Sequence, residues 1–537
     1  MSPFAARRRF SALLARRLAL LVAAALAAWM VAGCGIFPQG AYWGVHNGRP
    51  SENPSAAPCE PRPPETAAPS PQEEAALRTQ LQKSLTARWG SEDLASSARE
   101  MKDWIGLGVY SDVMETVVTF YVEPVSYRQL VVAGLESLRA ALDNADFLKQ
   151  FPEAADAAKR ERFAQALDIL LLKARAADPW FASQAADWVA IVMEKNRAIL
   201  GLPDGAIVAE FLFGAMDSLD RYSRYLTPEM LRIYEDQMAG RYVGIGAEVT
   251  SREGRLFMKV AFEGGAAAKA GLKVGDEITA VEGQSVAGLS IFDLGRKLRG
   301  KAGTKVNISV RTGGQGEPRE VELVRAVIYL PPVRDAQMLD AERGIAYVRL
   351  TEFQDGCADL LGGSVEKLAK QGAKKLILDL RDNPGGSLIE AVYVAGMFLH
   401  DGPVVSTRGR ALGATWKYDV PWFEPRAWDG PLVILVNEDS ASAAELLASA
   451  LTARDRATAV GRHTYGKGAV QIYFPADWGA AAVSLTIARV WDAKGQCLDG
   501  RGVTPQVKVA VPASAPGSLR DDPDVRAAMG VFQRPAP

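Results

Sequence analysis

Residues 376–386 read LILDLRDNPGG, a mostly apolar run that ends in a turn with two adjacent glycines. Two later segments repeat the pattern: residues 432–443 read LVILVNEDSASA, and residues 458–468 read TAVGRHTYGKG. Each is typical of a buried strand that runs into a glycine- or serine-rich turn. Because the carboxyl ends of parallel strands meet at one edge of a sheet, where ligands bind, we expect the three turns to lie together. The pattern predicts a parallel or mixed α/β core.

The chain before this core predicts two other kinds of structure. Apolar residues recur at three- and four-residue spacing, as in helices, over 129–142, 162–176 and 184–200. Five short strand-like segments then surround one helix at 290–300, and they span 242–249, 255–262, 276–283, 305–312 and 320–327. We therefore expect four successive regions: a helical domain at 73–238, a small β-rich domain at 239–328, the α/β core at 329–512 and a tail at 513–537.

The composition excludes several classes of protein. The chain has 537 residues, and 62 Lys and Arg balance 63 Asp and Glu, so the formal net charge is −1. Nucleic-acid binding would need a clustered basic excess, which is absent. With only four cysteines and three histidines, neither a disulfide scaffold nor a His/Cys-rich metal site is expected. We predict no metal and no cofactor.

The first 34 residues have the pattern of a targeting signal. Five arginines between Arg7 and Arg17 precede an uncharged run at 18–32, which is short for a membrane-spanning helix and fits a signal peptide. The run ends in Val31-Ala32-Gly33-Cys34, which resembles the bacterial lipobox and implies lipidation of Cys34. An uncleaved membrane anchor is the alternative. Gly35 follows the cysteine, where lipoproteins retained at the inner membrane typically carry Asp, and this favours the outer membrane.

A tether of Pro, Ser, Ala and Gly follows at 35–72. Both readings of the signal place the rest of the chain outside the cytoplasm, at the periplasmic face of a bacterial cell envelope. Three cysteines remain after Cys34, so the chain can form at most one further internal bridge. We expect Cys59, in the tether, to stay unpaired, and the sequence leaves open whether Cys357 and Cys497 pair. A homo-oligomer is compatible with the sequence.

The β-rich domain begins with a candidate peptide-binding loop, Val243-Gly244-Ile245-Gly246. Closely spaced glycines let backbone N–H groups converge on a carboxylate, and a free strand edge accepts an extended peptide as an additional strand. The stretch EGGAAAKAGLKVGDEITAVEGQSVAGLS at 263–290 resembles the centre of PDZ domains. A PDZ domain implies that the partner is the free C-terminus of a protein.

The turn at 438–443 is a candidate nucleophile site. A serine between a strand and a helix is exposed to a substrate, and the N–H groups of the first helical turn point at an oxyanion formed there. The hydroxyl needs a base. His463 is one candidate, but Lys467 is favoured, because burial between Gly466 and Gly468 would lower its pKa toward neutrality.

Together the motifs resemble the C-terminal processing peptidases, also called tail-specific proteases. The resemblance covers about 215–510, and six motifs occur in order: residues 214–229, the PDZ stretch, and residues 376–386, 435–445, 464–471 and 500–505. It implies a multidomain α+β fold with an N-terminal helical domain, a PDZ domain and an α/β protease core of the crotonase-like type.

The resemblance also implies roles for individual residues. Ser442 corresponds to the nucleophile, Lys467 to the base of a Ser-Lys dyad, and Gln471 to the residue that orients the lysine by hydrogen bonding. The oxyanion donors correspond to the backbone N–H of Ala443 and of Gly385 or Gly386.

Several alternatives stay open. Ser440 is a rival nucleophile, and Ala444 stands where the family usually has serine. Residues 143–205 form an insertion without an identified counterpart. A non-catalytic peptide-binding or adaptor lipoprotein is the competing function.

Overall fold

The computed structural model describes residues 41–42, 71–90, 92–101, 103–176, 181–238, 240–252, 254–262, 264–287, 291–421, 427–476, 481–510 and 518–533. The predicted signal peptide with Cys34, and the tether except for residues 41, 42, 71 and 72, lie outside these residues. The chain divides into two compact units: one runs up to Leu231 and resumes at Asp335, and the other spans Arg232–Arg334. Within the described ranges, no helix is long and apolar enough to cross a membrane.

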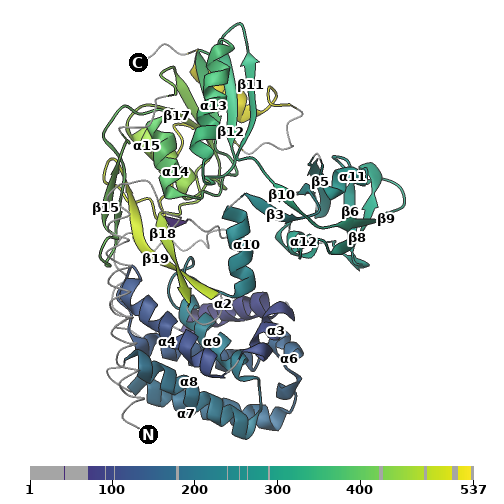
Figure 1. The fold of residues 1–537 in the computed structure, drawn as a ribbon, viewed down its shortest axis with the longest axis vertical. Helices are drawn as coiled ribbons and strands as arrows, with labels where there is room; N and C mark the ends of the chain where they lie inside the picture. Colours follow the sequence, from purple (N-terminus) through teal and green to yellow (C-terminus); the bar gives the residue numbers. More distant parts are fainter. Residues whose placement is uncertain are drawn as a thin grey trace, which may run out of the picture. The chain divides into compact units, whose positions relative to one another are not determined.

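The first part of the larger unit is a helical bundle (Figure 1). Its helices are α2 (Pro71–Trp89), α3 (Glu92–Glu100), α4 (Asp103–Phe120), α5 (Tyr127–Ala141), α6 (Ala145–Gln150), α7 (Ala157–Ala176), α8 (Ala182–Ile199) and α9 (Asp204–Asp217), with a 3₁₀ turn η1 (Pro152–Ala154). Glycines let α5 and α9 approach closely: a Cβ on Gly134 would lie 2.9 Å from the Phe211 Cα. Buried Glu210 accepts hydrogen bonds from Arg88, Trp89 and Ser137. The segment 143–205 therefore folds as part of this bundle.

The core of the larger unit is a sheet with the strand order β11-β12-β13-β16-β17-β20. The strands are β11 (Val333–Asp340), β12 (Ile345–Leu350), β13 (Lys375–Asp379), β16 (Leu432–Val436), β17 (Thr458–Gly461) and β20 (Val507–Lys508). From β12 to β20 all neighbours are parallel. Successive residues of β13 and β16 are buried, so both faces of the sheet are covered.

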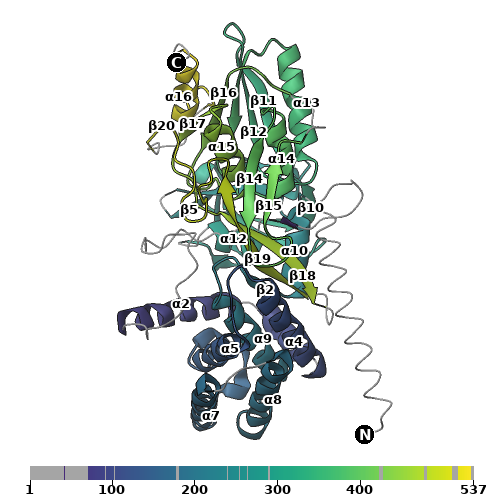
Figure 2. The same cartoon turned by 90° about the vertical axis from the view of Figure 1, so that its left-hand side faces the viewer.

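The covering helices are α13 (Cys357–Lys370), α14 (Leu388–Gly396), α15 (Ala443–Ala453) and α16 (Pro523–Val531). In Figure 2 the central strands lie between α13 and α16. Val525 and Ala528 of α16 pack in one cluster with Ile377, Val433 and Val460 of the strands. The α/β core predicted from the three strand–turn segments is therefore confirmed.

A second sheet of the larger unit was not expected from the sequence. Its order is β1-β18-β19-β14-β15, with β2 also paired to β19. The strands are β1 (Ala41–Tyr42), β18 (Ala469–Ala476), β19 (Ala481–Asp492), β14 (Pro403–Arg408), β15 (Trp416–Asp419) and β2 (Arg224–Leu226). Ten of the twelve residues of β19 are buried, so the strand lacks the polar alternation by which sequence reasoning finds strands.

The smaller unit is β-rich, as predicted. One sheet has the order β4-β5-β6-β8-β9, with β7 paired to β6, and a separate ladder joins β3 to β10. Its elements are β3 (Arg241–Gly244), β4 (Ala247–Arg252), β5 (Arg255–Ala261), α11 (Ala266–Lys269), β6 (Glu277–Val281), β7 (Gln284–Ser285), α12 (Ile291–Leu298), β8 (Lys305–Arg311), η2 (Thr312–Gly314), β9 (Arg319–Val324) and β10 (Ala326–Tyr329). Helix α10 (Pro228–Met238) spans the boundary between the units. The strands predicted at 242–249 and 320–327 are each divided in two.

Two cysteines lie in the described part of the chain. Cys357, the first residue of α13, is free and buried. Cys497 is disulfide-bonded. The two therefore do not pair with each other. The expectation that Cys59 stays unpaired concerns a residue outside the described part of the chain.

Candidate active site

Ser442 stands at a strained turn between β16 and α15. It has φ +59° and ψ −118°, a backbone conformation that residues with a side chain rarely adopt. Its side chain is buried, and its Oγ makes no hydrogen bond with any described residue. A Cβ on Gly385 would lie 2.6 Å from the Ser442 Cβ, so the glycine turn packs directly on the serine. A strained serine with an unused hydroxyl has the character of a nucleophile elbow.

Two backbone N–H groups beside Ser442 are available to an oxyanion. The N–H of Ala443, at the first position of α15, and the N–H of Gly386 donate to no group among the described residues. The N–H of Gly385 donates to Asn383 Oδ1 at 2.9 Å. Of the two glycines predicted as donors, Gly386 therefore has the free N–H, while Gly385 lies against the serine.

Lys467 lies in the turn after β17 and is buried. Its Nζ is 5.1 Å from the centre of the Tyr222 ring. Burial, helped by the positive charge of Arg224, lowers the pKa of Lys467 to about 7, although Asp220, Asp499 and Glu445 act in the opposite direction. The lysine is therefore in part a neutral amine at neutral pH.

Glu445 links the serine turn to the lysine turn. Its carboxylate accepts hydrogen bonds from the N–H of Ser442 at 2.9 Å and of Lys467 at 2.8 Å. It also accepts from the N–H of Gly466 and from the hydroxyl of Thr464. The side chain is completely buried, and burial raises its pKa, while these hydrogen bonds oppose the rise. Sequence reasoning missed this role, although Glu three residues after a Ser at a helix start is the pattern of a capping box.

Gln471 lies on β18, where its Nε2 donates to the Thr486 hydroxyl at 3.0 Å. Its Oε1 is buried and has no hydrogen-bond partner among the described residues. The structure thus places Ser442, Lys467 and Gln471 on three elements of one unit, but it shows no hydrogen bond from Ser442 Oγ to Lys467 and none from Lys467 to Gln471 Oε1.

The two alternative catalytic residues are engaged elsewhere. The Ser440 hydroxyl donates to Leu380 O at 2.8 Å, and its oxygen accepts from the Asn437 N–H at 2.9 Å. It is a structural link between two turns. His463 is exposed, and its Nδ1 lies 3.1 Å from the Thr504 hydroxyl. Neither residue makes a hydrogen bond with Ser442 Oγ.

The candidate peptide-binding loop lies in the smaller unit. Val243 and Gly244 belong to β3 and pair with β10, whereas Ile245 and Gly246 form the bend before β4. The N–H groups of Ile245 and Gly246 donate to no group among the described residues, while their carbonyls accept from Ala267 and Phe262. Gly246 has φ +79°, and a Cβ there would lie 2.8 Å from the Gly265 Cα. Only glycine fits this bend.

Beside the bend, β4 is an edge strand. Among the described strands it pairs only with β5, and α12 lies against it. An edge strand next to a helix is the geometry that accepts an extended peptide as an additional strand. No group of three or more His, Cys, Asp or Glu in the described ranges is arranged to hold a metal ion.

Comparison with known proteins matches two segments of the chain to protein families. The model of peptidase family S41 matches residues 344–509, and a PDZ domain model matches residues 260–312. The carboxy-terminal-processing protease of Bartonella bacilliformis is 31% identical over 313 residues, which are 58% of this chain and 71% of that protein. The carboxy-terminal processing protease CtpA of Bacillus subtilis is 33% identical over 312 residues, which are 58% of this chain and 64% of that protein. The chain belongs to the carboxy-terminal processing proteases.

As a carboxy-terminal processing protease, the chain is a serine-type peptidase with a PDZ domain. Among solved structures it is similar to the photosystem II D1 C-terminal processing protease, at 29% identity and a TM-score of 0.41, over 59% of this chain and 86% of that one. The S41 match contains all three turns around Ser442 and ends before α16. The predicted family and fold class are confirmed.

Proposed function

We propose that this protease is a lipid-anchored endopeptidase outside the cytoplasm, which captures the free C-terminus of a protein and cleaves near that tail with Ser442 and Lys467. The observation that carries the proposal is the presence of two unusual side chains on adjoining turns. Ser442 has a buried hydroxyl with no hydrogen-bond partner in the described part of the chain, and burial lowers the pKa of Lys467 to about 7. Glu445 binds the backbone N–H of both residues, which keeps their turns together.

In the proposed first step, neutral Lys467 takes the proton from Ser442 Oγ as the oxygen attacks the peptide carbonyl carbon. The carbonyl oxygen becomes an oxyanion, which the N–H groups of Ala443 and Gly386 stabilise. Losing one such donor typically costs about 2.7–4 kcal/mol of barrier. The Lys467 ammonium then gives its proton to the leaving amine, and an acyl-enzyme remains.

Water completes the proposed reaction. Lys467 accepts a proton from the water as its oxygen attacks the ester, and the proton returns to Ser442 Oγ when the acid product leaves. Gln471 Oε1, which accepts no hydrogen bond from any residue that the structure describes, is an acceptor for the lysine N–H groups in the charged state. No metal or cofactor takes part in these steps.

Tail recognition is assigned to the loop Val243–Gly246. The free N–H groups of Ile245 and Gly246 suit a terminal carboxylate, and the open edge of β4 suits the residues before it. Because backbone groups form this contact, selection among tail sequences falls to the side chains of the bound peptide.

The anchor and the compartment are proposed from the sequence, with one structural support. The lipobox-like run assigns lipidation to Cys34, and Gly35 favours the outer membrane. Cys497 is disulfide-bonded, as expected in an oxidising compartment such as the periplasm. A Cys34→Ser variant should lose incorporation of labelled fatty acid and move from the membrane to the soluble fraction.

The proposed chemistry is tested with a reporter protein that ends in an apolar free C-terminus. Wild type should cleave it and should react with a fluorophosphonate probe at Ser442, whereas Ser442→Ala and Lys467→Ala should do neither. Equal cleavage by all three proteins would overturn the dyad. Binding of the reporter by wild type without any cleavage would favour an adaptor.

A further inference from the structure

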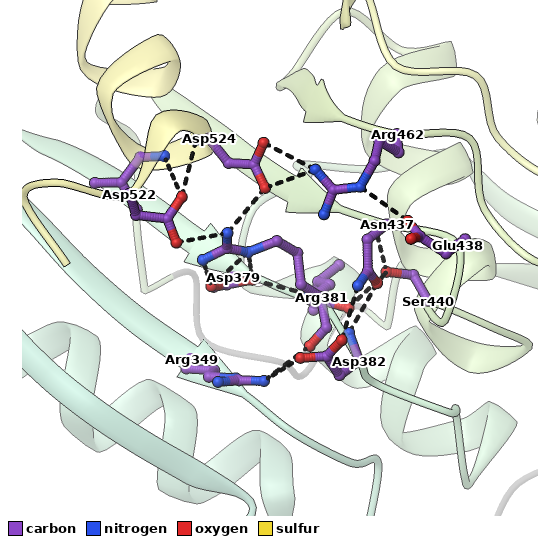
Figure 3. A network of polar contacts seen from close by, with 12 residues as sticks. Arg349, Asp379, Arg381, Asp382, Asn437, Glu438, Ser440, Arg462, Asp522 and Asp524 are labelled. Carbon is purple, nitrogen blue, oxygen red and sulfur yellow. Dashed lines mark hydrogen bonds and ion pairs between the residues drawn. The ribbon is translucent and has the colours of Figure 1, made fainter. Parts of the chain in front are cut away.

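A network of charged side chains joins residues at the starts of the three turns that carry the candidate catalytic residues (Figure 3). Two of its carboxylates, Asp522 and Asp524, come from the start of α16. The two arginines that they bind begin two of the turns, Arg381 before the glycine turn and Arg462 before the lysine turn. A helix outside the S41 match therefore binds residues at the start of two of these turns.

Arg381 is held by three carboxylates. It binds Asp379 of its own strand at 2.6 Å, and its Nη1 donates to Asp522 at 2.8 Å and to Asp524 at 2.9 Å. Burial acts to lower the pKa of Arg381, but the charges and hydrogen bonds of Asp379 and Asp522 outweigh it and raise the pKa. The guanidinium is therefore a fixed positive charge, held at several points.

Arg462 connects the other two turns. Its Nη1 donates to both oxygens of Asp524 at 3.1 Å, and its Nε donates to Glu438 at 2.8 Å. Glu438 lies in the turn that leads to Ser442. Asp524, whose side chain is only 2% exposed, thus bridges the arginines of the oxyanion turn and the lysine turn.

Further hydrogen bonds connect the three turns to one another near the candidate catalytic residues. Asn437 accepts from the Asp382 N–H at 2.9 Å and donates to the Asp382 carboxylate at 2.7 Å. The Ala441 N–H donates to Asn383 O, and the Tyr465 N–H donates to Ser440 O. The three turns are therefore joined to one another by hydrogen bonds, and they connect to the charged network through Arg381, Glu438 and Arg462.

Helix α16 is held by a capping hydrogen bond and by apolar packing in addition to these charges. Asp522 caps it, because its Oδ1 accepts from the Asp524 N–H at 2.9 Å while its Oδ2 binds Arg381. Val525 and Ala528 pack against the central strands. This packing helps to fix the positions of the two carboxylates at the start of the helix.

We propose that α16 is a positioning element of the active site, in which Asp524 sets the spacing between the oxyanion turn and the lysine turn through Arg381 and Arg462. The proposal rests on the proposed function of Ser442 and Lys467. A shift of about 1 Å in a catalytic group can reduce turnover by about a hundredfold, so a bridge that fixes two turns affects the rate although it touches no substrate.

The test compares three single variants in the full-length protein. Asp524→Asn keeps the shape and removes the charge, and should lower both kcat and the rate of fluorophosphonate labelling at Ser442 by about tenfold, with KM within about twofold of wild type. Val525→Ala weakens the packing of the same helix without touching an arginine, and should lower Tm with kcat within about twofold of wild type. Asp521 is an exposed neighbour whose carboxylate binds Ser518 and no arginine among the described residues, so Asp521→Asn should leave kcat, KM and Tm unchanged.

The outcomes separate positioning from general stability. Wild-type kcat and labelling rate in Asp524→Asn would overturn the proposal, as would an equal loss of kcat in Val525→Ala at the same loss of Tm. If Asp524→Asn does not fold, Arg462→Lys decides, because it keeps the charge but lacks the planar fork that binds Asp524 through Nη1 and Glu438 through Nε. It should lower kcat about threefold at unchanged KM. Absence of labelling at Ser442 in wild type would instead contradict the proposed function.

Discussion

The turns around Ser442 and the edge of β4 present different kinds of atoms to a peptide. The turns present individual buried side chains, and hydrogen bonds of Glu445, Asn437 and Ser440 hold these turns in place. At the PDZ edge, the available groups are repeated backbone N–H and C=O groups along one strand. We infer that one substitution can abolish catalysis at the turns, whereas substitutions at the PDZ edge lower the affinity for the peptide in small steps. The predictions test this difference in order of effect.

The largest effect is expected from removing one oxygen. Ser442→Ala should lower kcat by roughly 10⁴-fold or more while the fold is kept, because that hydroxyl bonds to no other group within the described ranges. Measurement of peptide cleavage and of Tm checks this. Ser440→Ala is the control: it breaks the bonds to Leu380 and Asn437, and should lower stability by about 1–3 kcal/mol while probe labelling at Ser442 continues. Labelling of the Ser442→Ala protein at Ser440 would contradict the assignment.

A methyl group next to the serine should have the second largest effect. In Gly385→Ala the new Cβ meets the Ser442 Cβ at 2.6 Å, and the backbone has φ +107°, so the glycine turn must move. We expect kcat to fall by about a hundredfold. Gly413→Ala is the matched control, since that glycine also has positive φ but nothing lies near its Cβ. The control should lose about 1 kcal/mol of stability and no kcat.

The dependence of activity on pH should follow the protonation of Lys467. Because the neutral amine is the base and the pKa of Lys467 is about 7, kcat should fall as pH falls through 7, by about tenfold for each unit below it. A flat profile between pH 5 and 9 would contradict the role of Lys467.

The same pKa predicts an effect on stability. The folded-state pKa lies below the ordinary value of 10.5, so the folded protein disfavours the charged lysine, and this penalty is complete below about pH 7 and absent above 10.5. Lys467→Met should therefore raise the free energy of unfolding most at pH 7 and below. Denaturant unfolding at pH 6.5 and 10 measures the difference. An equal change in stability at both pH values would show that burial does not lower this pKa.

The sequence predicted those parts of the molecule that have a periodic pattern. The helices at 129–142, 162–176 and 184–200 are α5, α7 and α8 within a few residues, because each has one apolar face. The helix α16 was missed, because it is short and the strands that it packs against lie far away in the sequence. The break between β3 and β4 also depends on a distant residue, because Gly246 bends where Gly265 approaches it.

The candidate site shows the same limit. The types and order of Ser442, Lys467 and the glycine turn are visible in the sequence. The choice between Gly385 and Gly386 depends on the Asn383 side chain, which occupies one of the two N–H groups. The bridges that Glu445 and Asp524 make to the other turns join residues 19 to 143 positions apart, and no spacing in the sequence predicts these long-range contacts.

The smallest effect is expected at the PDZ edge. Gly246→Ala places a Cβ 2.8 Å from the Gly265 Cα in a bend with φ +79°, which should displace the N–H groups of Ile245 and Gly246. We expect KM for a substrate with a free C-terminal carboxylate to rise by about tenfold at unchanged kcat, because only tail binding is weakened. Gly254→Ala, with φ +74° and open space around it, should leave KM unchanged. Amidation of the substrate tail should raise KM for wild type but add little to the effect of Gly246→Ala, because both changes remove the same contact. If amidation raises KM equally in wild type and variant, the carboxylate binds elsewhere, and the bend at Gly246 only shapes the domain.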